Sequence, residues 1–188
     1  GDVSQSGHSF TPDTSNPGAT VAVHSEGDQR FGTGALSIAG GGHVRAPGSA
    51  DFNFGGGDFT VEWWHKNGIP GAQTAQHVLS YSNDSAGWYW AAGLNTTSWR
   101  LMFWGTDDPF YDVNPANEGL SADMDGQWHH LAVVRSGDEI RFFVDGIYGR
   151  NETHKQSRIR TGPLADYLGD LLIGTWTPNS FYLTGLMD

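Results

Sequence analysis

The chain of 188 residues contains no cysteine. It can form no disulfide bond and offers no thiolate as a nucleophile or metal ligand. Basic residues are also few: 10 Lys and Arg stand against 21 Asp and Glu, which gives a formal net charge of −11. Such a charge repels phosphate backbones and anionic bilayers alike. The composition therefore argues against nucleic acid as a partner.

Long apolar runs and helical periodicity are missing as well. No segment approaches the roughly 20 apolar residues that a membrane-spanning helix needs, so we expect no membrane insertion. The first residues also lack the charged and then apolar pattern of a secretion signal. No stretch has apolar residues spaced three and four apart over several turns, and no long helix is predicted.

Glycine and aromatic residues are what the chain has in abundance. It contains 27 Gly and eight Trp, and the glycines separate short apolar runs. In DFTVEWWHK, Phe59, Val61 and Trp63 alternate with more polar neighbours, as in a strand that buries one face. Repeated strands without intervening helices predict an all-β fold, a two-sheet antiparallel jelly-roll β-sandwich in which sequential strands pair.

The length predicts one domain, because 188 residues are enough for one substantial core and too few for two typical ones. Residues 1–30 are rich in Gly, Ser, Thr and Asp, so we expect a loop-rich segment with one peripheral strand at TVAVH. Residues 31–188 should form the sandwich. The chain begins without Met and stops at Asp188 within an apparent strand, so we expect a piece of a longer polypeptide.

The segment DGQWHHLAVVRSGDEIRFFVDG, residues 125–146, reads as two strands joined by a Gly-Asp turn. His129 and His130 are adjacent in the first strand, so they should point to opposite faces and cannot bind one metal ion together. We expect His130 to be a partly buried imidazole with satisfied hydrogen bonds. Asp145 should hydrogen-bond its own backbone within the second turn.

Several of these segments together resemble a known family. GDFTVEWWHK, the 125–146 hairpin, LLIGTW and FYLTGLMD follow one another in the order and rough spacing seen in laminin-G-like domains of the concanavalin A-like lectin/glucanase superfamily. RFGTGALSIAGGGHVRAP is similar to the first block of the same group. The resemblance covers about residues 31–188 and implies a concanavalin A-like sandwich. In that family the closing motif continues beyond the Asp, so the terminal strand is expected to be missing or incomplete here.

The chain lacks the residue patterns of the main catalytic classes. Members of this superfamily that cleave β-glucans resemble one another in an ExDxE strand, which carries the nucleophile and the general acid, and this chain has no such triplet. Its acidic groupings lie in Gly- or Pro-flanked loops, and GxSxG, P-loop and HExxH patterns are absent. We therefore predict no catalytic residues and no enzyme, with glycoside hydrolysis as the less favoured alternative.

The resemblance also implies a calcium site, because some laminin-G-like domains bind Ca²⁺ with Asp side chains and loop carbonyls. Asp188 matches the closing Asp of the family and is the first candidate ligand. Asp28, just before the first block, is the second, if its loop approaches Asp188. The alternative is that both are ordinary surface or turn carboxylates.

Aromatic residues between 87 and 111 suggest a ligand site. A pyranose stacks its apolar face on an aromatic ring, while its hydroxyls need polar partners such as the neighbouring Asp and Asn. We predict Trp104, Tyr111 and Trp90 as ligand-binding residues. The alternative is that these rings fill a second hydrophobic layer or a subunit interface.

These observations favour a non-catalytic recognition or adhesion module that binds a glycan or a protein surface. The resemblance extends to domains of large bacterial surface proteins and of phage tail or capsid decoration proteins, so an extracellular or virion-surface location is expected. The competing hypothesis is a purely structural assembly protein, in which aromatic side chains join copies into a homo-oligomer or bind other virion proteins.

Overall fold

The structure, a computed structural model, describes residues 7–22, 27–68, 76–82, 87–92, 99–103, 111–113, 125–148, 162–176 and 182–188. Of strands β7, β8 and β9 it describes the backbone. The strands run in the order β1 (Thr11–Asp13), β2 (Thr20–Ala22), β3 (Leu36–Ala39), β4 (His43–Ala46), β5 (Phe59–Asn67), β6 (Gln76–Ser82), β7 (Gly87–Ala92), β8 (Trp99–Phe103), β9 (Tyr111–Val113), β10 (Trp128–Ser136), β11 (Glu139–Val144), β12 (Ile147–Tyr148), β13 (Leu171–Ile173) and β14 (Gly185–Met187).

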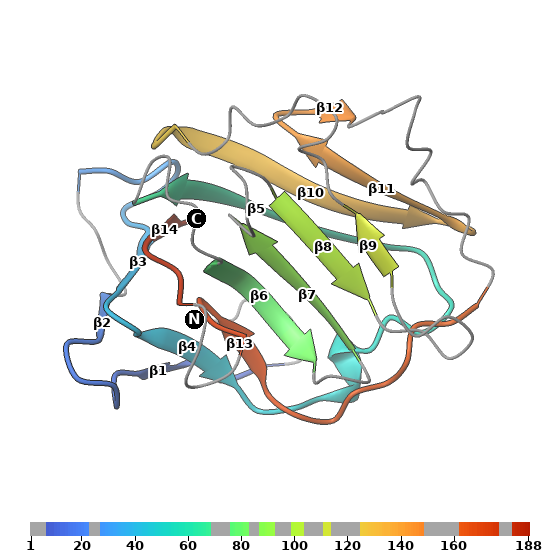
Figure 1. Ribbon diagram of the computed structural model, residues 1–188, viewed down its shortest axis with the longest axis horizontal. Helices are drawn as coiled ribbons and strands as arrows, with labels where there is room; N and C mark the ends of the chain where they lie inside the picture. The colour runs from blue at the N-terminus through green and yellow to red at the C-terminus, as the bar shows by residue number, and fades with distance from the viewer. Residues whose placement is uncertain are drawn as a thin grey trace.

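These strands form two antiparallel sheets stacked face to face (Figure 1). One, the β6 sheet, has the order β1-β4-β13-β6-β7-β8-β9, and the other, the β5 sheet, has the order β12-β11-β10-β5-β14-β3-β2. The helical content of the described residues is one 3₁₀ turn, Ala50–Phe52. None of the helical structure described is long and apolar enough to cross a membrane. The predicted all-β jelly-roll sandwich is confirmed.

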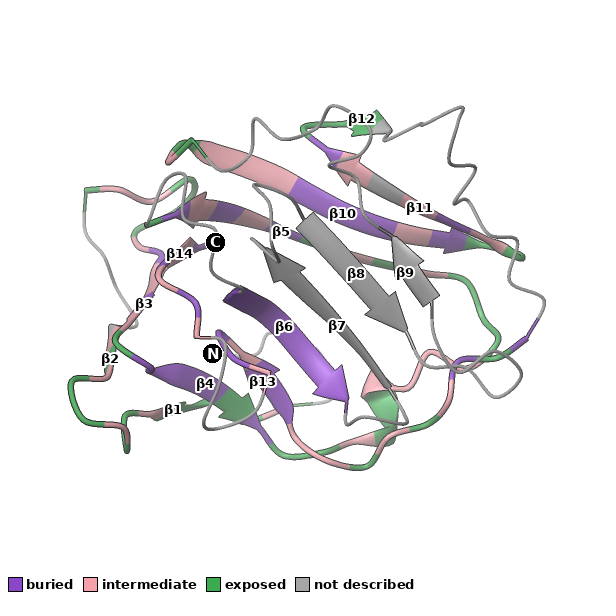
Figure 2. Ribbon diagram, in the orientation of Figure 1, coloured by how far each residue is buried: buried purple, intermediate pink, exposed green. Residues whose placement is uncertain are grey.

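The core lies between the sheets and receives side chains from both. Strand β5 alternates, with Trp63 and His65 buried on the inner face while Glu62 is exposed on the outer one, as the sequence period predicts. The β6 strand is buried along its whole length (Figure 2). The apolar side chains that meet in this core include Ile38, Trp63, Leu131, Val133 and Ile140 from the β5 sheet and Ala46, Leu79, Tyr81 and Leu171 from the β6 sheet.

The expected pairing of sequential strands holds for the hairpins and is wrong elsewhere. Strands β6 to β9 and β10 to β12 pair in chain order, but β4 and β5 lie in different sheets, as do β5 and β6. The segment that ends at Asp188 forms β14, which pairs with both β5 and β3 inside the β5 sheet. The sandwich is therefore assembled by non-local pairs that no local turn signal indicates.

A buried arginine fixes one end of the long β10–β11 hairpin. Arg135 is 3% exposed. Its guanidinium donates hydrogen bonds to the carbonyls of Gly137, Gly55 and Gly162. One side chain thus satisfies three loop carbonyls from segments that are far apart in the sequence, and it ties the hairpin end to both loops.

Candidate functional site

Strand β10 divides its side chains between the two faces of the β5 sheet. The register pairs His129 with His65, on the inner face, and His130 with Trp64, on the outer face. The prediction that His129 and His130 point to opposite faces is confirmed. The strand therefore contributes to two separate polar arrangements, one on each side of the sheet.

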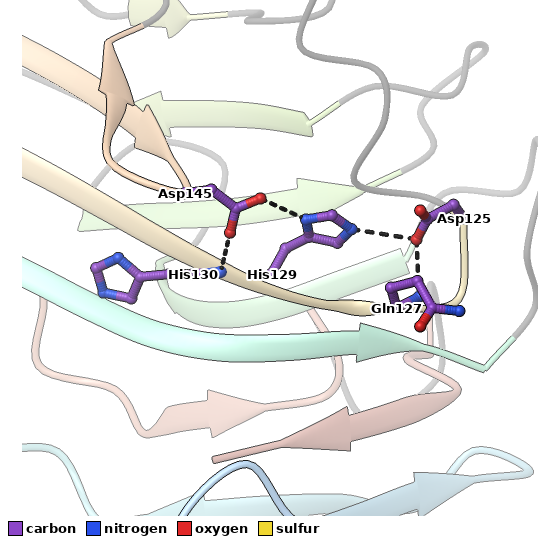
Figure 3. A network of polar contacts seen from close by, with 5 residues as sticks. All are labelled: Asp125, Gln127, His129, His130 and Asp145. Carbon is purple, nitrogen blue, oxygen red and sulfur yellow. Dashed lines mark hydrogen bonds and ion pairs between the residues drawn. The ribbon is translucent and has the colours of Figure 1, made fainter.

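On the inner face His129 bridges two carboxylates (Figure 3). Its Nδ1 lies 2.7 Å from Oδ2 of Asp145, and its Nε2 lies 3.1 Å from Oδ1 of Asp125. The same Asp125 oxygen accepts a hydrogen bond from the Gln127 N–H at 2.7 Å. The bridge joins the start of β10 to the turn between β11 and β12.

Asp145 can make this contact because of its backbone conformation. It has φ 50° and precedes Gly146 with φ 76°, which are the left-handed values of a two-residue Asp-Gly hairpin turn. Its second carboxylate oxygen accepts a hydrogen bond from the His130 N–H at 2.9 Å. The expectation that Asp145 bonds its own backbone is wrong, because the turn presents its carboxylate to the neighbouring strand β10.

The pKa values of His129 and His65, on the inner face of the β5 sheet, are shifted in opposite directions. Burial disfavours the charged form of His129, but the hydrogen bonds to Asp145 and Asp125 outweigh it, so its pKa is raised. Burial lowers the pKa of His65 to about 3, and the neighbouring charge of His129 adds to this effect. Both ring nitrogens of His129 face carboxylates, which leaves neither to take a substrate proton or to bind a metal ion. The bridge is best explained as a structural link.

The outer face carries a group that we call the Trp64 cluster, namely Arg30, Phe31, Glu62, Trp64 and His130. The Trp64 ring lies between the others: Phe31 meets it edge-on at 5.5 Å between centroids, and the His130 ring lies 5.3 Å away. The Arg30 guanidinium lies 4.4 Å from the Trp64 centroid and 5.1 Å from that of Phe31. His130 Nε2 is 3.3 Å from a Glu62 oxygen, and that the imidazole is satisfied stays a prediction.

The side-chain carboxylate of Asp188 holds the cluster together. Oδ2 of Asp188 accepts hydrogen bonds from the N–H groups of Arg30 and Phe31 at 2.9 and 2.7 Å. The backbone of Asp188 exchanges hydrogen bonds with Trp64. Asp188 therefore holds the loop that places Phe31 against Trp64. Sequence reasoning missed this cluster, although Trp64 on the polar face of a predicted strand was an available signal.

The predicted calcium ligands are near the same strand but have other partners. Asp188 binds the two loop amides, and Asp28 lies 2.6 Å from the Lys66 ammonium, whose hydrogen bond lowers the pKa of Asp28. Across the described parts of the chain, no three or more His, Cys, Asp or Glu side chains are grouped to hold a metal ion. Calcium binding by Asp188 and Asp28 stays a prediction.

The predicted ligand-binding aromatics belong to the other sheet. Trp104 lies outside the described residues. Trp90 of β7 pairs with Leu79 of β6. Tyr111 of β9 pairs with Phe103 of β8. Phe103 in turn pairs with Trp88 of β7, which pairs with Tyr81 of β6. Trp90 and Tyr111 therefore occupy positions on the face of the β6 sheet that also carries Leu79 and Tyr81 of the core. A ligand role for these residues stays a prediction.

Comparisons with known proteins agree with the architecture. The family model described as the concanavalin A-like lectin/glucanases superfamily matches residues 39–188. No curated protein matches the chain.

Solved structures show the same fold at low sequence identity. The binding domain of paraclostridial mosquitocidal protein 1 superposes with a TM-score of 0.69 at 10% identity, over 100% of this chain and 44% of that one. The botulinum neurotoxin serotype G binding domain gives 0.61 at 11% identity, over 97% and 42%. The receptor binding domain of botulinum neurotoxin D gives 0.60 at 6% identity, over 97% and 43%. The chain thus spans less than half the length of these neighbours.

Proposed function

The chain belongs to the concanavalin A-like lectin/glucanases superfamily, and we propose that it is a non-catalytic recognition module that binds a glycan through the Trp64 cluster. The observation that carries this proposal is an exposed ring beside charged groups on the outward face of the β5 sheet. Phe31 is 54% exposed, yet its backbone is held by Asp188 and its ring by Trp64. Its position is therefore set before a ligand arrives.

Such an arrangement fits the chemistry of a sugar. The C–H face of a pyranose packs on an aromatic ring, and the hydroxyls around it need donors and acceptors. Arg30 supplies donors and Glu62 supplies acceptors next to the rings. Because the cluster is preorganised, little conformational entropy is lost when the ligand binds.

The carboxylates beside the cluster give no support to hydrolysis. Glycosidases use two carboxyl groups that flank the scissile bond, one as acid and one as nucleophile or base. Here Glu62 contacts His130 and Asp188 binds two backbone amides. The structural neighbours include the binding domain of paraclostridial mosquitocidal protein 1 and the receptor binding domain of botulinum neurotoxin D, which is consistent with a recognition role.

A glycan array tests the proposal directly. Wild type should bind a defined set of glycans, and Phe31→Ala should weaken that binding by about 5-fold or more, because one stacking contact is lost. Leu168→Ala is the matched control, since Leu168 is 81% exposed and lies outside the cluster. Unchanged binding by Phe31→Ala, or no glycan bound by the folded wild type, would overturn the proposal.

We further propose that the module acts outside a cell or on a virion surface, within a larger surface, tail or capsid decoration protein. The competing hypothesis is a structural assembly protein in which exposed rings such as Phe31 join copies of the chain. Light-scattering mass separates the two. A monomer that binds glycans supports recognition, whereas a stable oligomer that Phe31→Ala dissociates supports assembly.

A further inference from the structure

A shallow hollow lies on the β6 sheet, where β1 pairs with β4. Its volume is about 160 Å³, and its lining residues are Thr11, Pro12, Asp13, Arg45 and Pro47. We propose that this hollow binds a single neutral sugar residue, as a subsite separate from the Trp64 cluster. The inference rests on the proposed function for the class of its ligand.

The polar groups of the hollow retain bonding capacity. Thr11 is paired with Arg45 in the register and Asp13 with His43, so these residues share one face of the sheet. The Arg45 guanidinium, 54% exposed, uses Nε for an ion pair with Asp170 at 3.1 Å, and its terminal nitrogens have no other ion pair among the residues described. Those nitrogens are donors that a ligand can use.

Asp13 supplies the matching acceptor. One of its oxygens accepts a hydrogen bond from the Ser15 N–H at 3.0 Å, and this bond, together with one from the Ser15 side chain, lowers the pKa of Asp13. Its other oxygen lies 3.7 Å from Nε2 of the buried His43, which is longer than a hydrogen bond. Each carboxylate oxygen has two lone pairs, so Asp13 can accept a hydrogen bond from a ligand in addition to those from Ser15.

The charges of the hollow select against simple ions. An anion attracted to Arg45 meets Asp13, and a cation attracted to Asp13 meets Arg45. A sugar hydroxyl both donates and accepts, so neighbouring hydroxyls of one ring can bond Asp13 and Arg45 together. Pro12 and Pro47 also line the hollow and add apolar atoms to it, which can meet the C–H groups of the ring. A hollow of this size is smaller than the usual small-molecule pocket, which limits it to one residue.

NMR titration of the ¹⁵N-labelled chain tests the site with methyl glycosides of glucose, galactose, mannose and N-acetylglucosamine. At least one should shift the amide signals of Thr11, Asp13 and Arg45, with a dissociation constant on the order of 1 to 10 mM. Arg45→Leu and Thr11→Val should each weaken that binding, the first by about 10-fold or more. Arg141→Leu is the control, because it removes another exposed arginine–carboxylate pair, with Glu139.

Free glycine is the competing probe, because a zwitterion also carries both charges. Shifts of Thr11, Asp13 and Arg45 caused by glycine, with none from the glycosides, would overturn the inference. It also falls if binding survives in Arg45→Leu. If Phe31→Ala loses binding on the glycan array while glycosides still shift the amide signals of the hollow, both sites are supported. If glycosides bind at the hollow and Phe31→Ala binds the array as wild type does, the present inference is supported and the glycan site at the Trp64 cluster is refuted.

Discussion

Replacing His65 with leucine should remove most of the loss in free energy of unfolding that this histidine causes at acidic pH. His65 is 1% exposed on the inner face of β5, and burial lowers its pKa to about 3. Below its ordinary pKa of 6.5, the unfolded chain takes up a proton that the folded chain excludes. The stability associated with neutral His65 is therefore present above pH 6.5 and is lost progressively as the pH falls toward 3.

The size of this effect follows from the two pKa values. Between about pH 7.5 and about pH 5, an unfolded-state histidine with pKa 6.5 takes up nearly one proton, while a group with pKa about 3 stays neutral. One pKa unit corresponds to about 1.4 kcal/mol, so this histidine should lower the free energy of unfolding by roughly 2 kcal/mol over that interval. His65→Leu should lack this part of the loss.

Urea denaturation followed by tryptophan fluorescence measures the difference. Wild type should lose about 2 kcal/mol more than His65→Leu when the pH changes from about 7.5 to about 5. His130→Gln is the control, because it removes the adjacent outward-facing histidine and should leave the wild-type pH dependence of His65 in place. Equal losses in wild type and His65→Leu would show that the folded protein protonates His65, and the reasoning from burial would be refuted.

Three other substitutions test the links around the site. Asp145→Asn should lower the pKa of His129 measured by NMR. The difference in free energy of unfolding between wild type and this variant should be greatest below pH 6.5 and should shrink as the pH rises through the raised pKa of His129. An unchanged pKa would contradict the bridge. Arg135→Leu should lower the free energy of unfolding by about 3 kcal/mol, because three carbonyl bonds are lost; a loss below about 1 kcal/mol in urea denaturation would contradict this. Gly185→Ala should lower the melting temperature, because the added Cβ would lie 2.4 Å from the Lys66 carbonyl oxygen. An unchanged melting temperature would show that β14 can shift away from β5 without loss of stability.

The parts of the fold that depend on local pattern could be predicted from the sequence. Period-two alternation placed Trp63 inward and Trp64 outward in β5, and the 125–146 segment formed the expected hairpin. The alternation also separated His129 from His130, because side chains on a strand alternate whatever its partners are. These inferences needed only the geometry of one extended strand.

The parts that depend on partners distant in sequence could not be predicted. Asp188 contacts Arg30 and Phe31 across more than 150 residues, and nothing in a local pattern indicates that β14 lies between β5 and β3. In the sequence Asp145 has the pattern of an ordinary turn residue, and only the folded structure places it beside His129. The Trp64 cluster was missed for the same reason, because its aromatic pair joins a loop to a strand.

The central claim is that a sugar ring packs on the outward rings of the β5 sheet. A crystal structure of the chain soaked with the strongest glycan from the array tests it most directly. The account predicts sugar density against Phe31 and Trp64, with hydroxyls within hydrogen-bond distance of Arg30 or Glu62. Density only on the β7–β9 side of the β6 sheet, or a second copy of the chain covering Phe31, would contradict it.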